Sequence, residues 1–282
     1  MSTSKTPPVL LAVDGDSLAH RAYHGMPKTI RGAGGRPAGA LTGFGNFLLA
    51  LWERVQPDSV VVGWDSLGSP TYRHTALPSY QAGREFDDAI LEQLDALPAF
   101  VESFGFVAAK GAGFEADDFL AAAAADGAWP GIVVVVTSDR DAYQLVTDRV
   151  LVLQPVKGVS ELATIGPAEV RERYGVDAAQ VPDFIALRGD PSDKIPGAPG
   201  IGPKNAATIL NQYGSLEAAI EAGRFPEIAD DLRLYRRIAT MDPTAPLPKL
   251  GLTRPNWEGA AAHAESLGLG ALARRLAERA TQ

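Results

Sequence analysis

Uninterrupted hydrophobic runs at three places along the chain predict buried β-strands. They lie in PPVLLAVDGD from Pro7, PDSVVVGWDS from Pro57 and PGIVVVVTSDRD from Pro130, and each segment opens with proline and runs into aspartate. Because the runs lack polar alternation and helical stretches separate them, they are typical of a parallel sheet covered by helices. The run DRVLVLQP from Asp148 is a candidate fourth strand.

After Val156 the pattern becomes helical and rich in loops, and it indicates no long strand. The segments that carry this pattern include PAEVRERYGV, VPDFIALRGD, PKNAATILNQYG and LGALARRLAERA. Periodicity of this kind favours amphipathic helices. We therefore predict an α/β core over residues 1–173 and a helical region over residues 174–282.

Aspartates follow the predicted strands at the edge where α/β proteins place their functional sites. They are Asp14, Asp65, Asp139 and Asp141. A single aspartate in such a position is commonly a turn former. However, in open α/β sheets ligands bind beyond the carboxyl ends of the strands, so these four side chains are expected to converge.

The stretch GFEADDFL, residues 113–120, adds three more carboxylates at a predicted helix start. Glu115, Asp117 and Asp118 fall within four positions. Taken alone, the stretch fits a capped helix start equally well, because acidic residues are favoured in a first helical turn. Together with the strand ends it gives seven carboxylates, which repel one another unless cations lie between them. Two divalent ions about 3.5–4 Å apart are the usual arrangement for phosphodiester cleavage.

The amino-acid composition limits which metal ions the protein could bind and in which cellular compartment we expect it. The chain contains no cysteine, and its four histidines lack close metal-ligand spacing. Carboxylates must therefore hold any metal, which favours Mg²⁺ or Mn²⁺. No stretch reaches about 18 uninterrupted apolar residues, so we expect a cytoplasmic protein without a membrane partner.

A glycine-rich segment in the second half has the form of a helix-hairpin-helix. The segment is GDPSDKIPGAPGIGPKNAATIL from Gly189, and its core contains Gly200, Gly202 and Lys204. Such a turn presents backbone N–H groups, a helix N-terminus and a lysine to the solvent. These groups bind phosphate without reading bases.

A series of blocks between about residues 9 and 242 resembles one family in content and order. The blocks are VDGDSLAHRAYH, GGRPAGALTGF, WDSLGSPTYRHTALPSYQAGR, GFEADD, TSDRDAYQLVTDRVLVL, ERYGV, ALRGDPSDKIPGAPGIGPKNAA and YRRIATMD. They are similar to the 5′-nuclease family, which includes the 5′→3′ exonuclease domain of bacterial DNA polymerase I and the flap endonucleases. The resemblance implies a PIN-like nuclease core followed by a helical DNA-binding region, here without a polymerase domain.

The resemblance also implies a set of metal ligands. It places them at nine acidic residues: Asp14, Asp65, Glu115, Asp117, Asp118, Asp139, Asp141, Asp190 and Asp193. In this interpretation Asp14, Asp65, Glu115 and Asp117 lean toward one ion, and Asp139, Asp141, Asp190 and Asp193 toward the other, some through water. If these nine are set aside from the 34 acidic residues, 25 remain against 26 basic ones, so net negative charge does not exclude a nucleic-acid partner.

The same resemblance implies how DNA is bound. Arg73 and Arg84 would hold phosphate by bidentate contacts, and Arg21 matches a position near the phosphates. Tyr80 would stack on a base, although a packed core tyrosine fits its position equally well. In the family the hairpin loop binds K⁺ through backbone oxygens. The expected substrates are DNA with 5′ flaps, nicks or gaps, or RNA primer ends, and nothing in the sequence requires more than a monomer.

Three positions depart from the family pattern. The segment that reads Y-K-x-x-R in most relatives has Gln81 in place of the lysine, which is thought to stabilise charge on the scissile phosphate. Lys194 replaces the asparagine of the family's GDxSDN and would either weaken the second ion or contact DNA. Asp16 adds one more negative group near Asp14. These departures leave the rate and the balance of exonuclease and flap cleavage open.

Two alternatives remain at this point. A phosphatase of the haloacid dehalogenase type shares the strand-ending DxD pattern, but it needs a strand before its late acidic motif, where VPDFIALR is typical of a helix. A DNA-junction binding protein that has lost catalysis through Gln81 and Lys194 is the other. All nine carboxylates persist, however, and a pure binder would gain from losing charge that repels the DNA backbone.

Overall fold

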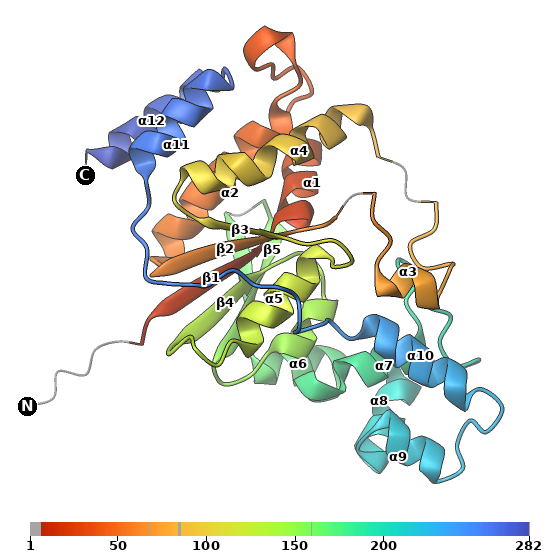
Figure 1. The fold of residues 1–282 in the computed structure, drawn as a ribbon. Helices are drawn as coiled ribbons and strands as arrows, with labels where there is room; N and C mark the ends of the chain where they lie inside the picture. Colours follow the sequence, from red (N-terminus) through yellow and green to blue (C-terminus); the bar gives the residue numbers. More distant parts are fainter. Residues whose placement is uncertain (1–6, 67, 84–85, 159, 282) are drawn as a thin grey trace, which may run out of the picture.

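The computed structural model describes residues 7–66, 68–83, 86–158 and 160–281, and within them six strands form one sheet (Figure 1). The strand order is β3-β2-β1-β4-β5-β6. The strands are β1 Val9–Asp14, β2 Ser59–Trp64, β3 Val107–Lys110, β4 Ile132–Val136, β5 Val150–Lys157 and β6 Glu161–Ile165. Neighbours from β3 to β5 pair in parallel and β6 pairs antiparallel with β5, which confirms the predicted, mainly parallel sheet.

The strands predicted from hydrophobic runs are all present, and two further strands lie at the sheet edges. The long runs correspond to β1, β2, β4 and β5. Strands β1, β2 and β4 are buried along most of their length, and β5 is buried at four of its eight positions. Strand β3 has only four residues, and β6 alternates exposed and buried positions. The prediction of a helical chain after Val156 is therefore wrong for Glu161–Ile165. An edge strand needs only one apolar face, so it lacks the continuous run that identifies a central strand.

Alternate residues of the central strand β1 belong to two separate hydrophobic cores, one on each face of the sheet. Leu11 and Val13 pack on the face covered by α1 Gly15–Gly25, α2 Gly39–Val55 and α4 Asp88–Ser103. Leu10 and Ala12 pack on the opposite face, with α5 Ala116–Ala125. Successive side chains of a strand point to opposite faces, so a continuous apolar run is the sequence signature of this two-sided burial. Each fully buried Leu or Val stabilises the fold by about 1.5–3 kcal/mol.

The helical region has a hydrophobic core of its own. Its elements are α6 Pro167–Tyr174, η3 Ala178–Gln180, α7 Val181–Arg188, α8 Pro203–Tyr213, α9 Leu216–Glu221 and α10 Ala229–Ala239. Phe184, Leu187, Leu210 and Leu216 lie in this core. The segment VPDFIALR forms helix α7, so the strand that a phosphatase of the haloacid dehalogenase type needs before GDPSD is not formed there.

The last two helices return to the N-terminal core (Figure 1). They are α11 Trp257–Ser266 and α12 Gly270–Ala280, and Leu272 and Leu276 of α12 join the core cluster under α2 and α4. Close packing depends on Gly45 in α2, because a Cβ there would come within 2.6 Å of Leu272 and 2.9 Å of Phe100. None of the described helices combines the length and the apolar character needed to cross a membrane.

Candidate active site

The aspartates that end β1 and follow β2 are fixed by neighbouring elements. Asp14 caps helix α1: its Oδ1 accepts from Ser17 N at 2.9 Å, and its Oδ2 accepts from the Thr137 hydroxyl at 2.6 Å. Asp65 accepts from Ala116 N in the first turn of α5 at 2.7 Å. Because strand ends and helix starts meet at this edge of the sheet, both carboxylates are held beside it.

Glu115 begins helix α5 and is held by three elements at once. Its backbone N–H donates to the Asp118 carboxylate at 3.0 Å in a capping box. Its Oε1 accepts from the Thr71 hydroxyl at 2.8 Å and its Oε2 from the Tyr80 hydroxyl at 3.0 Å. The carboxylate is therefore fixed in place before any ligand arrives.

The loop after β4 brings two more carboxylates to the same edge. The backbone N–H of Asp139 donates to the Thr137 hydroxyl at 3.0 Å, and Asp139 Oδ1 accepts from Asp141 N at 2.9 Å, at the start of η2 Asp141–Leu145. Since the same Thr137 hydroxyl donates to Asp14, it links the ends of β1 and β4. This buried threonine was not identified from the sequence.

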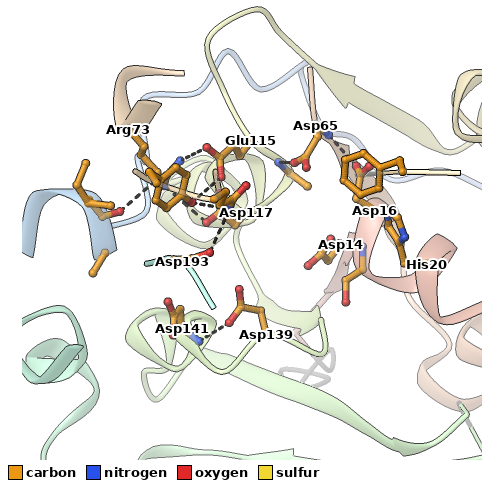
Figure 2. Close-up of a pocket in the computed structure, with 17 residues that line it drawn as sticks. Asp14, Asp16, His20, Asp65, Arg73, Glu115, Asp117, Asp139, Asp141 and Asp193 are labelled. Carbon is orange, nitrogen blue, oxygen red and sulfur yellow. Dashed lines mark hydrogen bonds and ion pairs between the residues drawn. The ribbon is translucent and has the colours of Figure 1, made fainter. Parts of the chain in front are cut away.

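These side chains surround one cavity of about 350 Å³ (Figure 2). Seven of the nine predicted ligands line it: Asp14, Asp65, Glu115, Asp117, Asp139, Asp141 and Asp193. Asp16, which the sequence placed as a further negative group near Asp14, also lines it. His20 and Phe86 line it too and were not predicted as site residues. Asp16 and His20 are four residues apart on α1, so helical spacing from the end of β1 would have placed both on one face. Figure 2 shows the labelled carboxylates facing one another across the cavity.

Burial and mutual repulsion raise the pKa of four carboxylates of the cavity in the absence of a cation. Burial raises the pKa of Asp14 from 3.8 to about 7, and the charges of Asp65 and Asp139 add to this rise. Burial likewise raises the pKa of Asp16, Asp117 and Asp141 well above the ordinary value, with neighbouring carboxylates contributing. A concentration of groups that resist ionisation together is typical of a site built for a cation.

The donor set of the cavity fits hard divalent ions, although the side chains do not yet converge on one point. Among the described residues, no three Asp, Glu or His side chains are close enough to hold a metal without adjustment. Asp117 Oδ1, however, is buried without a hydrogen-bond partner, which is costly for a carboxylate oxygen unless a ligand satisfies it. Carboxylates without thiolates or paired histidines are the ligands that Mg²⁺ and Mn²⁺ prefer.

We expect the metal-free protein to lose stability as the pH rises from 5 to 8. Below about pH 4 the carboxyl group of Asp14 is protonated in both the folded and the unfolded chain. Between the ordinary pKa of 3.8 and the folded value of about 7, only the folded chain keeps the proton, so the free energy of unfolding falls as pH increases. Thermal unfolding in EDTA across this pH range measures the effect.

Two additions test the cause of this pH dependence. The Asp14→Asn variant should show a flatter profile, because its side chain cannot ionise. Mn²⁺ should raise the unfolding temperature at pH 8 more than at pH 5, because metal binding requires deprotonated ligands. An equal response to Mn²⁺ at both pH values would contradict the assignment of these acids.

Arg73 and Asp118 lie inside the protein and pair with each other. Arg73 is 1% exposed, and its two terminal nitrogens donate to the two carboxylate oxygens of Asp118 at 2.9 and 2.7 Å. Its Nε donates to Ile238 O at 3.1 Å, and its guanidinium also lies 3.6 Å from Glu115 and Asp117. Arg73 therefore joins helix α5 to the end of α10. Asp118 has no exposed surface and pairs with Arg73. The phosphate contact of Arg73 and the metal contact of Asp118 stay predictions.

Asp190 does not line the cavity, unlike its neighbour Asp193. It closes a turn by accepting from Ser192 N at 2.8 Å, pairs with Arg188 at 3.1 Å, and bridges to Ile195 through the backbone. These contacts occupy its carboxylate, so the structure favours a role in shaping the loop that presents Asp193. A direct role of Asp190 at the second ion stays a prediction.

Tyr80 and Gln81 lie at the cavity wall. Tyr80 is 4% exposed and donates to Glu115, which favours the packed tyrosine over a base-stacking surface. Gln81 Nε2 donates to the Tyr80 hydroxyl at 2.8 Å and to Asp193 Oδ1 at 3.2 Å.

The two remaining arginines predicted to contact phosphate do not add to the described cavity. Arg21 donates to the carbonyl of Val156 at 3.0 Å and does not line the cavity. Arg84 lies outside the described residues.

The glycine-rich turn of the predicted helix-hairpin-helix lies at the surface of the helical region. Gly200 is exposed in the left-handed conformation at φ 75°, which glycine adopts without strain. Gly202 caps helix α8 without a side chain, so the first N–H groups of that helix are open to a ligand. Lys204 is exposed in the first turn of α8. The turn thus has the groups that a phosphate needs.

Two family models match consecutive parts of the chain. The model described as 5′-3′ exonuclease, N-terminal resolvase-like domain, matches residues 9–175. The model described as 5′-3′ exonuclease, C-terminal SAM fold, matches residues 176–257. A 5′-3′ exonuclease of Streptomyces coelicolor is 35% identical over 298 residues, covering 94% of this chain and 98% of the relative. DNA polymerase I of Mycobacterium bovis is 40% identical over 223 residues, or 78% of this chain.

The chain spans about a quarter of the length of the DNA polymerase I relatives that it matches, covering 25% of the Mycobacterium bovis protein.

Among solved structures, the bacteriophage T5 flap endonuclease in a complex with DNA and metal ions has a TM-score of 0.66 at 21% identity, covering 97% of this chain and all of that one. The human GEN1 complex with Holliday junction DNA has a TM-score of 0.56 at 15% identity, covering 92% and 71%. At these identities the structures support the fold.

Proposed function

The chain belongs to the 5′-3′ exonuclease family, and from this premise we propose that it is a structure-specific 5′ nuclease that hydrolyses DNA phosphodiesters in replication and repair. One observation carries the proposal. Carboxylates from the ends of β1, β2 and β4 and from the start of α5 line a single cavity at the carboxyl edge of the sheet. Such a set of acids, with raised pKa values and an unsatisfied Asp117 oxygen, is suited to divalent ions.

Following the family resemblance, we assign the residues to two candidate ligand groups for Mg²⁺ or Mn²⁺. Asp14, Asp65, Glu115 and Asp117 would hold one ion, and Asp139, Asp141 and Asp193 the other. When bound, two such ions supply a metal-activated water and offset the charge that develops on the phosphate and the leaving 3′-oxygen. No side chain is required as the nucleophile.

The surrounding residues position the acids for this task. The Ser17 N–H and the Thr137 hydroxyl each donate to one oxygen of Asp14, and the Ala116 N–H donates to one oxygen of Asp65, so both carboxylates are held in a fixed orientation. Burial raises the pKa of Tyr80, so its hydroxyl stays protonated and donates to Glu115. Partners of this kind orient metal ligands before the ion arrives.

DNA is the proposed partner of the helical region. The exposed turn with Gly200, Gly202 and Lys204 would bind backbone phosphates, independent of sequence, and hold the duplex beside the cavity. Backbone carbonyl groups of this turn are the donor class that K⁺ accepts, so K⁺ is a proposed ligand there. The preferred substrates in this proposal are 5′ flaps, nicks and gaps.

A cleavage assay tests the proposed function directly. Duplexes labelled at one strand and carrying a nick, a gap or a 5′ flap are incubated with the protein and Mn²⁺. We expect a product that ends at the flap junction and no cleavage in EDTA. Binding without cutting would instead identify a DNA-junction binding protein, and hydrolysis of small phosphate esters alone would identify a phosphatase.

A further inference from the structure

We propose that Lys194 supplies the bound phosphodiester with the positive charge that the cavity wall lacks. The inference rests on the proposed nuclease function and assigns one further residue to it. Lys194 belongs to the turn closed by the Asp190–Ile195 bridge, next to the cavity-lining Asp193.

The described lining of the cavity has a shortage of available positive charge. Seven predicted ligands and Asp16 line it, and the arginine among the described lining residues is Arg73. That guanidinium is 1% exposed and is committed to Asp118 and the end of α10. A side chain so enclosed cannot follow an entering phosphate. Gln81, which lines the cavity where DNA would enter, carries no charge.

Lys194 places its ammonium group next to Gln81. Its Nζ donates to the backbone carbonyl of Ala82, the residue that follows Gln81. The same two segments are joined again by Gln81 N to Asp193 O at 3.4 Å and by Gln81 Nε2 to Asp193 Oδ1 at 3.2 Å. The lysine therefore lies across the contact between the turn of residues 190–195 and the wall segment of residues 80–83.

The backbone at this contact is strained on both sides. Lys194 has φ 57° and Gln81 has φ 49°, and they are two of the four non-glycine residues with positive φ in the described chain. The left-handed conformation is unfavourable for side chains other than glycine and asparagine, and strain of this kind concentrates at functional sites. Glycine or asparagine would suit the turn better than lysine. The turn geometry therefore does not explain this lysine, and its side chain needs a separate reason.

The Lys194 side chain can also leave its present hydrogen bond to contact a phosphate. Lys194 is exposed, and a single hydrogen bond from a lysine to an exposed carbonyl contributes little stability. Exchange of the Ala82 carbonyl for a phosphate oxygen is favourable, because the charged acceptor makes the stronger hydrogen bond.

A double-substitution experiment tests this assignment. We compare single-turnover cleavage of a 5′-flap duplex with Mn²⁺ at saturating protein for the wild type, Lys194→Asn, Gln81→Lys and the double variant. We expect Lys194→Asn to slow cleavage about a hundredfold, as for loss of one donor to a developing charge. Restoring the charge at the other position should return the double variant to within about tenfold of wild type. A lysine that only braces the turn predicts no rescue.

DNA binding without metal gives a second readout. In EDTA, Lys194→Asn should reduce the slope of log Kd against log salt concentration by about one unit, the effect of one lost phosphate contact. Lys249→Asn, at an exposed lysine away from the cavity, is the matched control and should change neither quantity. Thermal unfolding of each variant verifies the fold.

Two results would overturn the assignment. One is a Lys194→Asn variant that cleaves at the wild-type rate with an unchanged salt slope; the other is a double variant no faster than Lys194→Asn alone. Both leave the proposed nuclease function in place. A wild-type protein that cuts none of the substrates would instead refute the proposed function together with this inference.

Discussion

Asp139→Ala is expected to reduce flap cleavage by at least about a thousandfold, which corresponds to about 4 kcal/mol of transition-state stabilisation. Asp139 lines the acidic cavity, and its Oδ1 accepts from Asp141 N at 2.9 Å, so one substitution removes a proposed ligand and loosens a second. The side chain is exposed, so its loss should leave the hydrophobic core unchanged. Single-turnover cleavage with Mn²⁺ measures the effect.

Asp148→Ala is the matched control for this variant. Asp148 is an exposed aspartate in the segment before β5 and does not line the cavity. The Asp148→Ala variant should therefore cleave at the wild-type rate. The Asp139→Ala variant should have an unfolding temperature and a DNA affinity in EDTA that are no lower than those of the wild type, because it loses a repulsive charge. Equal cleavage by Asp139→Ala and the wild type would refute the assignment of the cavity as the active site.

Arg73→Ala is expected to lower the free energy of unfolding by about 3–5 kcal/mol, the usual effect of breaking a buried ion pair from one side. The substitution leaves Asp118 without exposed surface and without its guanidinium partner. It also removes the donor to Ile238 O and thus the connection between α5 and α10. Urea unfolding monitored by circular dichroism measures the change.

Arg36→Ala provides the comparison, because Arg36 also pairs with one carboxylate but at the surface. The side chains of Arg36 and Glu92 are 67% and 46% exposed, and their nearest N and O atoms are 3.3 Å apart. Exposed pairs of this kind contribute at most about 1 kcal/mol. A similar small effect for Arg73→Ala would show that Arg73 is not the internal brace described here, and would favour its predicted role at a phosphate.

The sequence predicted the strands that build the site because they are central. Strands β1, β2 and β4 are buried on both faces, and their uninterrupted runs of Val and Leu lead directly into Asp14, Asp65 and the Asp139 loop. The edge strands β3 and β6 carry weaker signals because only one face of each is covered. The positions of the cavity carboxylates followed from the strand ends and the start of α5, so most of the cavity could be predicted from pattern alone.

Burial depth and long-range partners could not be predicted in the same way. The sequence shows that residue 73 is an arginine, but its partners lie 45 residues away at Asp118 and 165 residues away at Ile238. The guanidinium of Arg73 is buried because α3 Tyr72–Ala76 lies against residues of α5 and α10, which supply its hydrogen-bond partners. These contacts exist only in the folded chain. The same limit applies to Thr137, whose hydroxyl donates to a residue 123 positions distant.

Anomalous diffraction from crystals grown with Mn²⁺ tests the central claim most directly. We predict two Mn²⁺ peaks in the cavity, one beside Asp14, Asp65 and Asp117 and the other beside Asp139, Asp141 and Asp193. Data collected at the manganese absorption edge identify the element without reference to activity. A cavity without anomalous signal, or Mn²⁺ bound only at other surface acids, would contradict it.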